Sequence, residues 1–306
     1  MSDGAPTATR TAAVLVLYRP AAPPLALIRQ LRQSVAVVVV VDNDEAPDPA
    51  LHRAVEALGG QLIANANRGA IAGAYNRAVE WLDRQQHDRV DQVLLLDQDS
   101  DVSRLAAFLS DAEVAQCLAD PATAAVAPAY RDRATGLRGR FIELQRWRLH
   151  HLEREFSGPR RVAFVINSMS VWRCEALRRI GPFNESLALD HVDTEYCLRA
   201  RRLGLAVWVH GGHEFAHSIG ARRRYRFLGR ELQAGGHSAP RRFQIGRSTA
   251  WLARRYLLRE PAFALLCLLR LAYEAVGIVK VEDQAGAKLR SLARGAASGL
   301  FGRLGP

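Results

Sequence analysis

The first third of the chain alternates short apolar runs with segments whose apolar residues recur at helical spacing. The runs are of strand length and cover residues 12–20, 36–43, 61–69 and 92–97, and the first two are rich in β-branched residues and end in turn-forming residues. The segments between them, residues 25–34, 49–58 and 71–82, predict helices. Strands that alternate with helices predict a parallel sheet with helices wound around it. In such sheets, ligands bind at the carboxyl ends of the strands.

The pattern becomes less regular after residue 124. Strand character returns in residues 124–132, 161–173 and 206–212, and helices are predicted over residues 175–180 and 193–203. The polar, arginine-rich stretch from residue 136 to residue 155 predicts a surface loop or a hairpin. A basic, aromatic helix is predicted over residues 247–259.

Residues 261–281 are strongly apolar but contain Arg270 and Glu274. A membrane-spanning helix requires about 20 residues with few or no charges. We therefore expect a helix that lies in a membrane interface or docks on the domain, and an ordinary buried core helix is an equally good interpretation. The basic segments on either side favour an anionic membrane surface.

Composition narrows the class of protein. Of the 306 residues, 49% are hydrophobic, which is enough for a sizeable core, and the formal net charge of +11 favours anionic partners. The four cysteines are widely spaced and form no CxxC pair, which favours a reduced cytoplasm over a disulfide framework or a zinc site. Residues 1–11 lack the apolar core of a signal peptide and predict a short disordered lead.

The stretch "VLLLDQDSDV" (Val93 to Val102) ends a buried strand in three aspartates, Asp97, Asp99 and Asp101. In extended backbone all three carboxylates would lie on one side, whereas a turn after Asp97 would leave two to converge on one ion. A hard divalent cation binds several carboxylate oxygens held in one rigid place. A solvated acidic turn explains this stretch equally well, and only its place at the end of a central strand favours the metal site.

The segments after two of the strands bear on nucleotide binding. In "NRGAIAGAYNRA" (Asn67 to Ala78) a glycine turn precedes a helix N-terminus, whose amides suit a phosphate. In isolation, a plain strand–turn–helix connection is the better interpretation. The first strand is followed by "LYRP" without a glycine fingerprint, which argues against a nicotinamide enzyme and a P-loop ATPase.

Asp190, Asp193 and Glu195 lie at the start of a predicted helix. Acids in a first helical turn ordinarily cap the helix and complement its dipole, and Glu195 can pair with Arg199 four residues later. The alternative is a general base held beside a cation site, with a partner acid that fixes the local arginines.

"HGGHEFAHSIG" carries His210, His213 and His217. A zinc site would need more soft ligands nearby, so we expect most of these histidines to be structural. One specific alternative is that a histidine of this group joins the aspartates at the strand end.

Six motifs occur in the order found in family 2 glycosyltransferases: "VVDN", the helix start "NRGAIAGAYN", "LLLDQDS", "GPFNE", "DHVDTEYCLRA" and "HSIG". The chain resembles this family over residues 12–260. Within this family, the chain is most similar to bacterial rhamnosyltransferases of O-antigen and surface-polysaccharide assembly. The segments that carry this similarity are "DQDS", "DHVDTEYCLRA", "HSIG", "HSAPRRFQIGRSTAWLARRYL" and the tail "GLFGRLG". The resemblance implies an α/β domain of the GT-A fold over residues 12–240 and a helical, basic and apolar extension over residues 241–306.

The resemblance also implies roles for individual residues. Asp193 would be the catalytic base, Asp97 and Asp99 would be a DxD motif that binds Mg²⁺ or Mn²⁺ on the diphosphate, and His217 would complete the metal shell. The other candidates would contact the nucleotide sugar, and with Asp97 they are Tyr18, Asp42, Asn67, Gly69, Asn76, Asp190 and Glu195.

The function that this resemblance implies is an inverting, metal-dependent transfer of L-rhamnose from dTDP-L-rhamnose to a glycan or lipid-linked acceptor, at the cytoplasmic face of the inner membrane. A base must take the proton of the acceptor hydroxyl, and a cation must stabilise the departing diphosphate. The alternatives are another donor, such as a UDP-hexose or galactofuranose, or a catalytically inactive membrane-associated scaffold. Nucleic-acid binding is not expected, because only the charge supports it.

Three segments depart from the family pattern. "INSMS" (Ile166 to Ser170) stands where a serine–glycine pair is usual, "GRS" (Gly246 to Ser248) where an arginine–asparagine pair is common, and "LYRP" in place of "TYN". The first segment would lie near the acceptor, so a different acceptor is one consequence.

Overall fold

The computed structural model describes residues 10–85, 90–187, 189–217, 223–227 and 229–302. The chain forms two compact units, the first from Met1–Phe141 with Leu152–His217 and the second from Ile142–His151 with Ser218–Pro306. The expected disordered lead, the end of the "HSIG" motif and the end of the tail "GLFGRLG" lie largely outside the described residues. The domain boundary expected at residue 240 stays a prediction.

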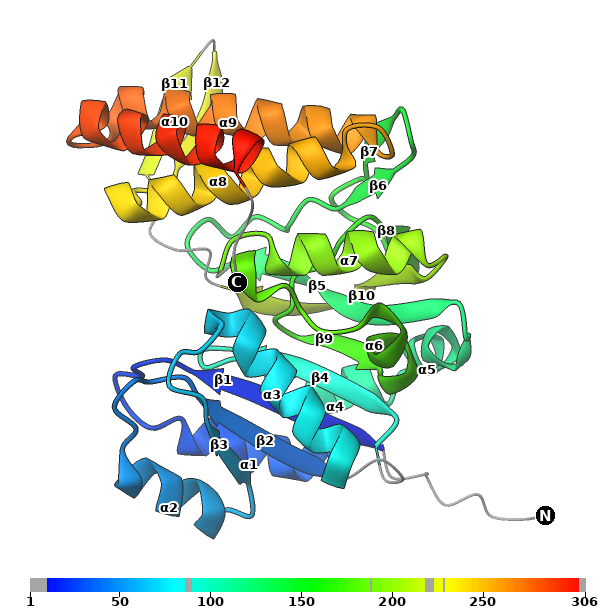
Figure 1. Ribbon diagram of the computed structural model, residues 1–306. Coiled ribbons are helices and arrows are strands. Elements are labelled where there is room, and N and C mark those ends of the chain that lie inside the picture. The colour runs from blue at the N-terminus through cyan, green and yellow to red at the C-terminus, as the bar shows by residue number, and fades with distance from the viewer. Residues whose placement is uncertain (1–9, 86–89, 188, 218–222, 228, 303–306) are drawn as a thin grey trace. The chain divides into compact units, whose positions relative to one another are not determined.

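An eight-stranded sheet with the order β3-β2-β1-β4-β9-β5-β10-β8 forms the centre of the first unit (Figure 1). The strands β1 to β4 pair in parallel, and β5 and β10 run in the same direction because β9 is antiparallel to both β4 and β5. The α/β fold class predicted from the sequence is confirmed. The strands are β1 (Thr11–Leu17), β2 (Val37–Asp42), β3 (Gln61–Ala64), β4 (Gln92–Asp97), β5 (Thr123–Asp132), β8 (Pro159–Val162), β9 (Ser170–Arg173) and β10 (Ala206–His217).

Helices cover this sheet, and their apolar stripes decide where they pack. The strand β1 is buried along its whole length, as expected of a parallel strand covered on both faces. Alternate residues of β1, β2 and β4 form one core with α1, α2, α4 and α5, whereas α3 packs against β1 and β2. The helices are α1 (Leu25–Ser34), α2 (Pro49–Ala57), α3 (Ala70–Gln85), α4 (Leu105–Leu109), α5 (Ala112–Ala119), α6 (Cys174–Ile180) and α7 (Val192–Arg202), with the short 3-10 helix η1 (Glu185–Leu187).

The single strand predicted over residues 161–173 is wrong, because the segment forms two strands. The first of them, β8, pairs with β10, and the second, β9, enters the sheet between β4 and β5. The link contains Met169, which has a left-handed backbone with φ of 65° and cannot continue a strand. Hydropathy alone does not reveal this interruption, because both halves are apolar.

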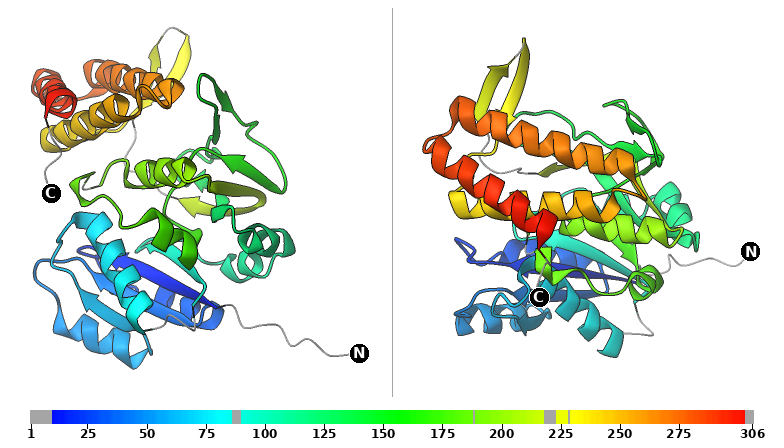
Figure 2. Two further views of the ribbon diagram at one scale, coloured as in Figure 1. Left: turned by 45° about the vertical axis from the view of Figure 1, so that its right-hand side comes forward. Right: turned by 45° about the horizontal axis from the view of Figure 1, so that its top comes forward.

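In its described residues, the second unit has three helices and two hairpins. The helices α8 (Ala239–Tyr256), α9 (Pro261–Val281) and α10 (Ala285–Phe301) lie side by side (Figures 1 and 2). The hairpins are β6 (Ile142–Leu144) with β7 (Leu149–His151), as predicted for the arginine-rich stretch, and β11 (Arg223–Phe227) with β12 (Arg230–Ala234). Over α10, only the general helical extension of residues 241–306 was predicted, without bounds for a separate helix.

A buried ionic cluster and close helix contacts hold the three helices together. Arg242 of α8 is fully buried and pairs with Glu274 of α9 and with Glu282, which also accepts a bond from Lys288 at 2.9 Å. A Cβ at Gly295 of α10 would lie 2.1 Å from the carbonyl oxygen of Phe243, so the two backbones approach too closely for a side chain at that position. Of the charged residues of α9, Glu274 thus has its partner inside the unit.

Candidate active site

The candidate site lies at the carboxyl ends of β1 and β4. The chain continues from β1 to β2 and β3 on one side and places β4 on the other side of β1, which makes the gap between β1 and β4 a topological switch point. Open α/β sheets bind ligands in the crevice outside such a point. The two strand ends are joined here, because the Tyr18 amide donates to Gln98 Oε1 at 2.8 Å.

The acidic strand end forms a turn and not an extended segment. The Ser100 amide donates to the Asp97 carbonyl at 3.1 Å, and the Asp97 amide donates to Ser100 Oγ at 2.9 Å. Asp101 is held separately: its carboxylate accepts from the Ser103 amide at 3.1 Å. Burial raises the pKa of Asp101, but bonds from Ser103 and the Ala216 amide and the charge of Arg133 outweigh burial, and the net pKa lies below its ordinary value.

Three carboxylates from two distant segments converge at this turn. The pKa of Asp97 is raised to about 6, first by burial and then by the negative charges of Asp99 and Asp193, against a hydrogen bond from Ser168 that lowers it. Like charges act in this way only when they are close. The fold therefore brings Asp193 of α7 within electrostatic range of the end of β4. A cluster of this kind favours protonation or a bound cation.

Ser168 is a site residue that the sequence did not identify. It is almost completely buried and hydrogen-bonds to Asp97, and its Oγ lies 3.0 Å from Ser100 Oγ. The only signal was the departure "INSMS" from the family pattern. Met169 follows in a left-handed backbone, where glycine is the least strained residue, and its amide donates to the Leu95 carbonyl at 2.8 Å. Met169 thus has a backbone conformation that a glycine would adopt with less strain.

The start of α7 presents Asp193 to the cluster. Its Oδ1 accepts from the Thr194 amide at 2.6 Å and from the Thr194 hydroxyl at 3.2 Å, which fixes the carboxylate. Asp190 lies just before the helix, and His191 between them has a left-handed φ of 67°. Backbone of this kind is costly for a side-chain-bearing residue and is often found at functional sites.

Glu195 has a supporting position in the structure. It is buried and pairs with Arg199 at 3.0 Å, and the Arg199 guanidinium donates to the carbonyls of Ile180 and Pro182 at 3.1 and 2.7 Å. This pair fixes the turn that precedes α7. Its predicted contact with the nucleotide sugar stays a prediction.

Tyr75 of α3 is the second residue that the sequence did not identify. Its side chain is fully buried, and its hydroxyl makes no hydrogen bond to the described residues. Its ring packs against Phe183 with centroids 5.3 Å apart, and Phe183 stacks on Tyr196 of α7. Burial, then the charges of Asp97 and Asp193, raise the pKa of Tyr75, so the phenol lies near the acidic cluster. In the sequence it looks like one more apolar position of a helix.

A polar network borders the ends of β1, β2 and β3. Asn67 donates to Glu45 at 2.9 Å and accepts from Asn43 at 3.2 Å, and Glu45 pairs with Arg19 at 3.0 Å. Hydrogen bonds from Asn67 and Arg19, together with its own backbone, lower the pKa of Glu45. The Tyr18 ring is 43% exposed beside this network, which leaves one face open to a planar ligand.

Asp42 is buried at the end of β2, and both of its carboxylate oxygens already have hydrogen-bond partners. Its Oδ1 accepts from the Asp44 amide at 3.0 Å, and its Oδ2 lies 3.1 Å from His52 Nε2. A direct contact with a base would use the remaining lone pairs of these oxygens. The predicted role stays a prediction.

Asn76 and Gly69 connect α3 to the "GPFNE" turn. The Asn76 side chain accepts from the Phe183 amide at 2.7 Å and donates to the Phe183 carbonyl at 3.0 Å and to Glu185 at 2.8 Å. Gly69 has a φ of 65°, and a Cβ there would lie 2.3 Å from the Glu185 carboxylate. Both residues therefore fix the segment that leads into α7, and their predicted nucleotide contacts stay predictions.

His217 ends β10 on the same edge of the sheet as Asp97. Its register partner is Asp132 of β5, and the next residue, Arg133, donates its amide to the His217 carbonyl at 3.0 Å. The Arg133 guanidinium donates to the Asp99 carbonyl at 3.3 Å. The acidic turn and the end of β10 are thus joined through Arg133, which suits the predicted place of His217 in a metal shell without testing it.

A second group of possible metal ligands lies at a bulge of β10. One ligand atom each from Asp111, His210 and His213 falls within 4.8 Å of the others among the described residues. The His210 Nδ1 accepts from the Gly212 amide at 3.1 Å, so its Nε2 carries the proton and faces Glu113 at 3.0 Å. A metal ion at Nε2 would need that nitrogen unprotonated. This arrangement fits a structural clamp between β10 and the start of α5.

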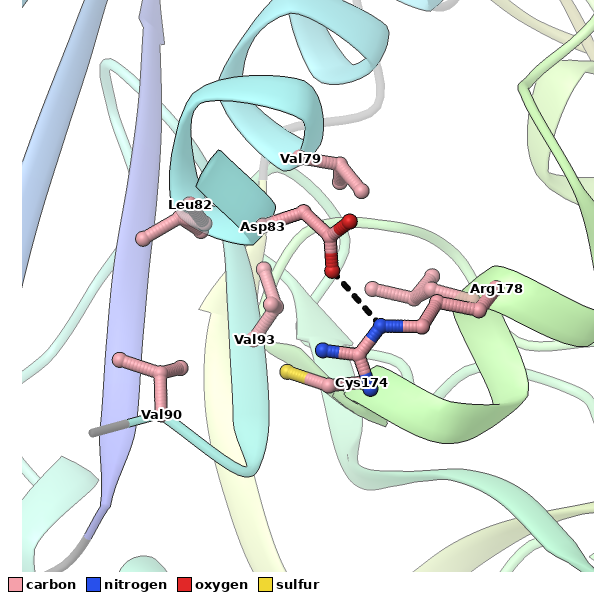
Figure 3. A pocket seen from close by; sticks show the side chains of 8 residues that line it. Val79, Leu82, Asp83, Val90, Val93, Cys174 and Arg178 are labelled. Carbon is pink, nitrogen blue, oxygen red and sulfur yellow. Dashed lines mark hydrogen bonds and ion pairs between the residues drawn. The ribbon is translucent and has the colours of Figure 1, made fainter. Parts of the chain in front are cut away.

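A cavity between α3 and α6 is lined by apolar side chains and closed by an ion pair (Figure 3). Val79, Val93 and Cys174 line it, and Arg178 Nε lies 2.6 Å from Asp83 Oδ1. No carboxylate of the acidic cluster lines this cavity, so it is separate from the candidate site.

Comparison with known proteins gives one curated relative. The chain is 26% identical over 273 residues to the dTDP-rhamnosyl transferase RfbF of Shigella flexneri, which covers 83% of this chain and 85% of that protein. The resemblance to bacterial rhamnosyltransferases predicted from the motifs is confirmed by this similarity. No family model matches the chain.

Solved structures with similar folds are more distant. Glucosyl-3-phosphoglycerate synthase from Mycobacterium tuberculosis, in a complex with Mn²⁺, UDP and its product, is 16% identical with a TM-score of 0.41, over 72% of this chain and 74% of that chain. A 4-diphosphocytidyl-2C-methyl-D-erythritol synthase is 15% identical with a TM-score of 0.40, over 66% and 89%.

Proposed function

We propose that this protein is a nucleotide-sugar glycosyltransferase of the GT-A type, whose active site is the acidic cluster at the switch point between β1 and β4. The observation that carries the proposal is the convergence of Asp97, Asp99 and Asp193 at a buried strand end, where burial and then the charges of Asp99 and Asp193 raise the pKa of Asp97 to about 6. A purely structural turn would gain nothing from three carboxylates that repel one another. A curated relative that is a sugar transferase supports the same class.

The donor set fits a divalent cation. Asp97 and Asp99 offer carboxylate oxygens, the ligands that Mg²⁺ and Mn²⁺ prefer, and His217 lies on the same edge of the sheet. A cation held there would neutralise charge on the leaving diphosphate. In the free protein, burial and the charges of Asp99 and Asp193 raise the pKa of Asp97, and the hydrogen bond from Ser168 opposes this rise.

Asp193 is the group that takes the acceptor proton in this proposal. Its carboxylate is half-buried, and the Thr194 amide and hydroxyl orient it toward an acceptor hydroxyl in this proposal. Removal of that proton makes the hydroxyl oxygen a nucleophile for the anomeric carbon, which inverts the configuration there. The Glu195–Arg199 pair keeps the base in position by fixing the turn before α7.

The finer assignment is an L-rhamnose donor carried on dTDP, with a glycan or lipid-linked acceptor and action at the cytoplasmic face of the membrane. It rests on the motif wording and on the dTDP-rhamnosyl transferase relative. A UDP-hexose or galactofuranose donor is the alternative within the same fold, and an inactive scaffold is the alternative outside enzymes.

The test is a thermal-shift measurement of the purified chain with dTDP-rhamnose, dTDP and UDP, each with and without Mn²⁺. We expect dTDP compounds to raise the melting temperature only when Mn²⁺ is present, and Asp99→Ala to lose that rise. A larger rise of the melting temperature with UDP would indicate a UDP-linked donor in place of a dTDP-linked one. No rise with any nucleotide would overturn the proposal.

Asp193→Asn separates catalysis from binding. We expect rhamnosyl transfer to fall by about a thousandfold or more, in line with the loss of a general base, while the thermal shift with dTDP and Mn²⁺ stays near that of the unaltered chain. Loss of the nucleotide shift together with activity would contradict the assignment of Asp193 as the base.

A further inference from the structure

The outer face of α9 is an exposed apolar stripe. Leu265, Leu268 and Leu269 expose 56%, 51% and 59% of their surface, and further along the helix Tyr273 and Val279 expose 38% and 59%. Successive residues of this set are three, one, four and six positions apart, which at 3.6 residues per turn places all five on one side of the helix. The opposite side, with Phe263, Cys267 and Ile278, is buried inside the second unit.

This stripe is not the surface of a core helix. Within the most apolar 18-residue window of α9 only 28% of the residues are buried, although the mean hydropathy reaches 1.9. A core helix would bury most of such a window. Soluble monomers rarely expose contiguous apolar surface of this kind unless it meets a partner.

The helix also cannot leave the unit to span a bilayer without losing its inner contacts. Glu274 pairs with the buried Arg242, and a Cβ at Gly277 would lie 3.1 Å from the Ala234 side chain, which shows how closely α9 packs there. Extraction would leave the Arg242 charge buried without this partner, which is costly. If α9 meets a bilayer, it must therefore lie parallel to the membrane surface, with only the stripe inserted.

The formal charges of the two units indicate which kind of surface the stripe contacts. The second unit carries 19 Lys and Arg residues against 6 Asp and Glu, a formal charge of +13, whereas the first unit carries 23 against 25, a formal charge of −2. All of the net positive charge of the protein thus belongs to the unit that bears the stripe. On α9 itself the exposed residues include Arg270 and Lys280 and no acid.

We infer that the α9 stripe docks on an anionic lipid bilayer, with the leucines inserted among the acyl chains and the arginines and lysine at the headgroups. Each basic residue near such a surface adds attraction to acidic lipid, and long basic side chains extend to the headgroup level while their stems stay apolar. A second copy of the chain fits less well, because two units of charge +13 would face each other. The inference does not depend on the proposed sugar transfer.

The experiment is flotation of the full chain with vesicles of phosphatidylcholine, with and without an equal part of phosphatidylglycerol, and needs no nucleotide. We expect binding to the anionic vesicles that falls steeply in high salt, and much weaker binding to neutral ones. Equal binding to both kinds of vesicle, or no binding to either, would overturn the inference.

Variants test the stripe itself. Leu265→Gln with Leu269→Gln should lower partition onto anionic vesicles by about tenfold or more, because two exposed leucines no longer leave water. Leu137→Gln with Leu203→Gln, two leucines of the first unit with 50% and 45% exposure, is the matched control and should bind like the unaltered chain. Unchanged binding by the α9 double variant would overturn the inference.

The charge is tested in the same way. Arg259→Gln with Arg270→Gln should weaken binding to anionic vesicles, and Arg29→Gln with Arg53→Gln, exposed arginines of the first unit, should not. Thermal melting of each variant shows whether it is folded, which is expected since all these side chains are exposed.

The oligomeric state without lipid, measured by light scattering, completes the test. A dimer that forms in the unaltered chain and is lost in the leucine double variant would assign the stripe to a second copy and overturn the lipid assignment.

Discussion

At the scale of single residues, the acidic cluster gives the protein an unusual dependence on pH. The pKa of Asp97 is raised by burial and by the charges of Asp99 and Asp193, so the native protein holds a proton that the unfolded chain has already released. Between the ordinary pKa and about 6, the native state binds more protons, and its stability falls as the pH rises. The full penalty, roughly 3 kcal/mol by the size of the shift, is present above pH 6.

We therefore expect Asp97→Asn to raise the free energy of unfolding at pH 7 in the presence of a chelator, and to have little effect near pH 4. Urea denaturation across this range measures it. Asp101→Asn is the matched control with the opposite sign: its pKa is lowered, so its stabilisation is present above the ordinary pKa and is lost as the pH falls through the lower, native one. If Asp97→Asn destabilised the protein at pH 7, the repulsion between the carboxylates would be excluded.

The buried hydroxyl of Tyr75 should also affect the stability of the protein. This hydroxyl makes no hydrogen bond to the described residues although it lies near Asp97 and Asp193. Tyr75→Phe should therefore raise the free energy of unfolding by about 1 kcal/mol, because an unpaired buried group is removed. If the hydroxyl serves the bound substrate, sugar transfer should fall by about tenfold with the same variant.

Tyr196→Phe is the control from the same aromatic cluster. Its hydroxyl donates to the Gly181 carbonyl at 2.9 Å, so the loss of this bond should lower the free energy of unfolding, also by about 1 kcal/mol. Thermal melting and initial transfer rates separate the two effects. A Tyr75→Phe variant that is less stable than the unaltered chain would show that the hydroxyl has a partner in the fold.

At the scale of elements, the contact between α8 and α10 depends on glycine. A Cβ at Gly295 would lie 2.1 Å from the Phe243 carbonyl oxygen, so Gly295→Ala must push the two helices apart and should cost about 1–3 kcal/mol. Gly286→Ala in the same helix meets nothing nearer than the Arg290 guanidinium at 3.8 Å and should not destabilise the protein. Denaturant unfolding of both variants measures the difference, and equal stability would contradict such a close approach.

At the scale of the whole molecule, nucleotide chemistry and surface attachment belong to different units. The acidic cluster lies entirely in the first unit, and the apolar stripe and the net positive charge lie in the second. The Leu265→Gln and Leu269→Gln double variant should therefore keep the thermal shift with dTDP and Mn²⁺ that the unaltered chain shows, while it loses vesicle binding. Loss of the nucleotide shift in this variant would show that the two units are coupled.

The sequence by itself determined the order of β1 to β4 and of the helices α1 to α3 between them, because hydrophobic periodicity is a local property, and α1 and α9 have the predicted bounds. It also located the acidic strand end, since three aspartates after an apolar run are visible without a fold. It did not predict α4, α5 or the hairpin of β11 and β12. Only the tertiary structure decided that the strand predicted over residues 161–173 is two strands, that Ser168 hydrogen-bonds to Asp97, and that Tyr75 and Asp193 lie beside the same turn. Those contacts join segments that are far apart along the chain, and neither spacing nor composition encodes which strand ends meet at one edge of a sheet.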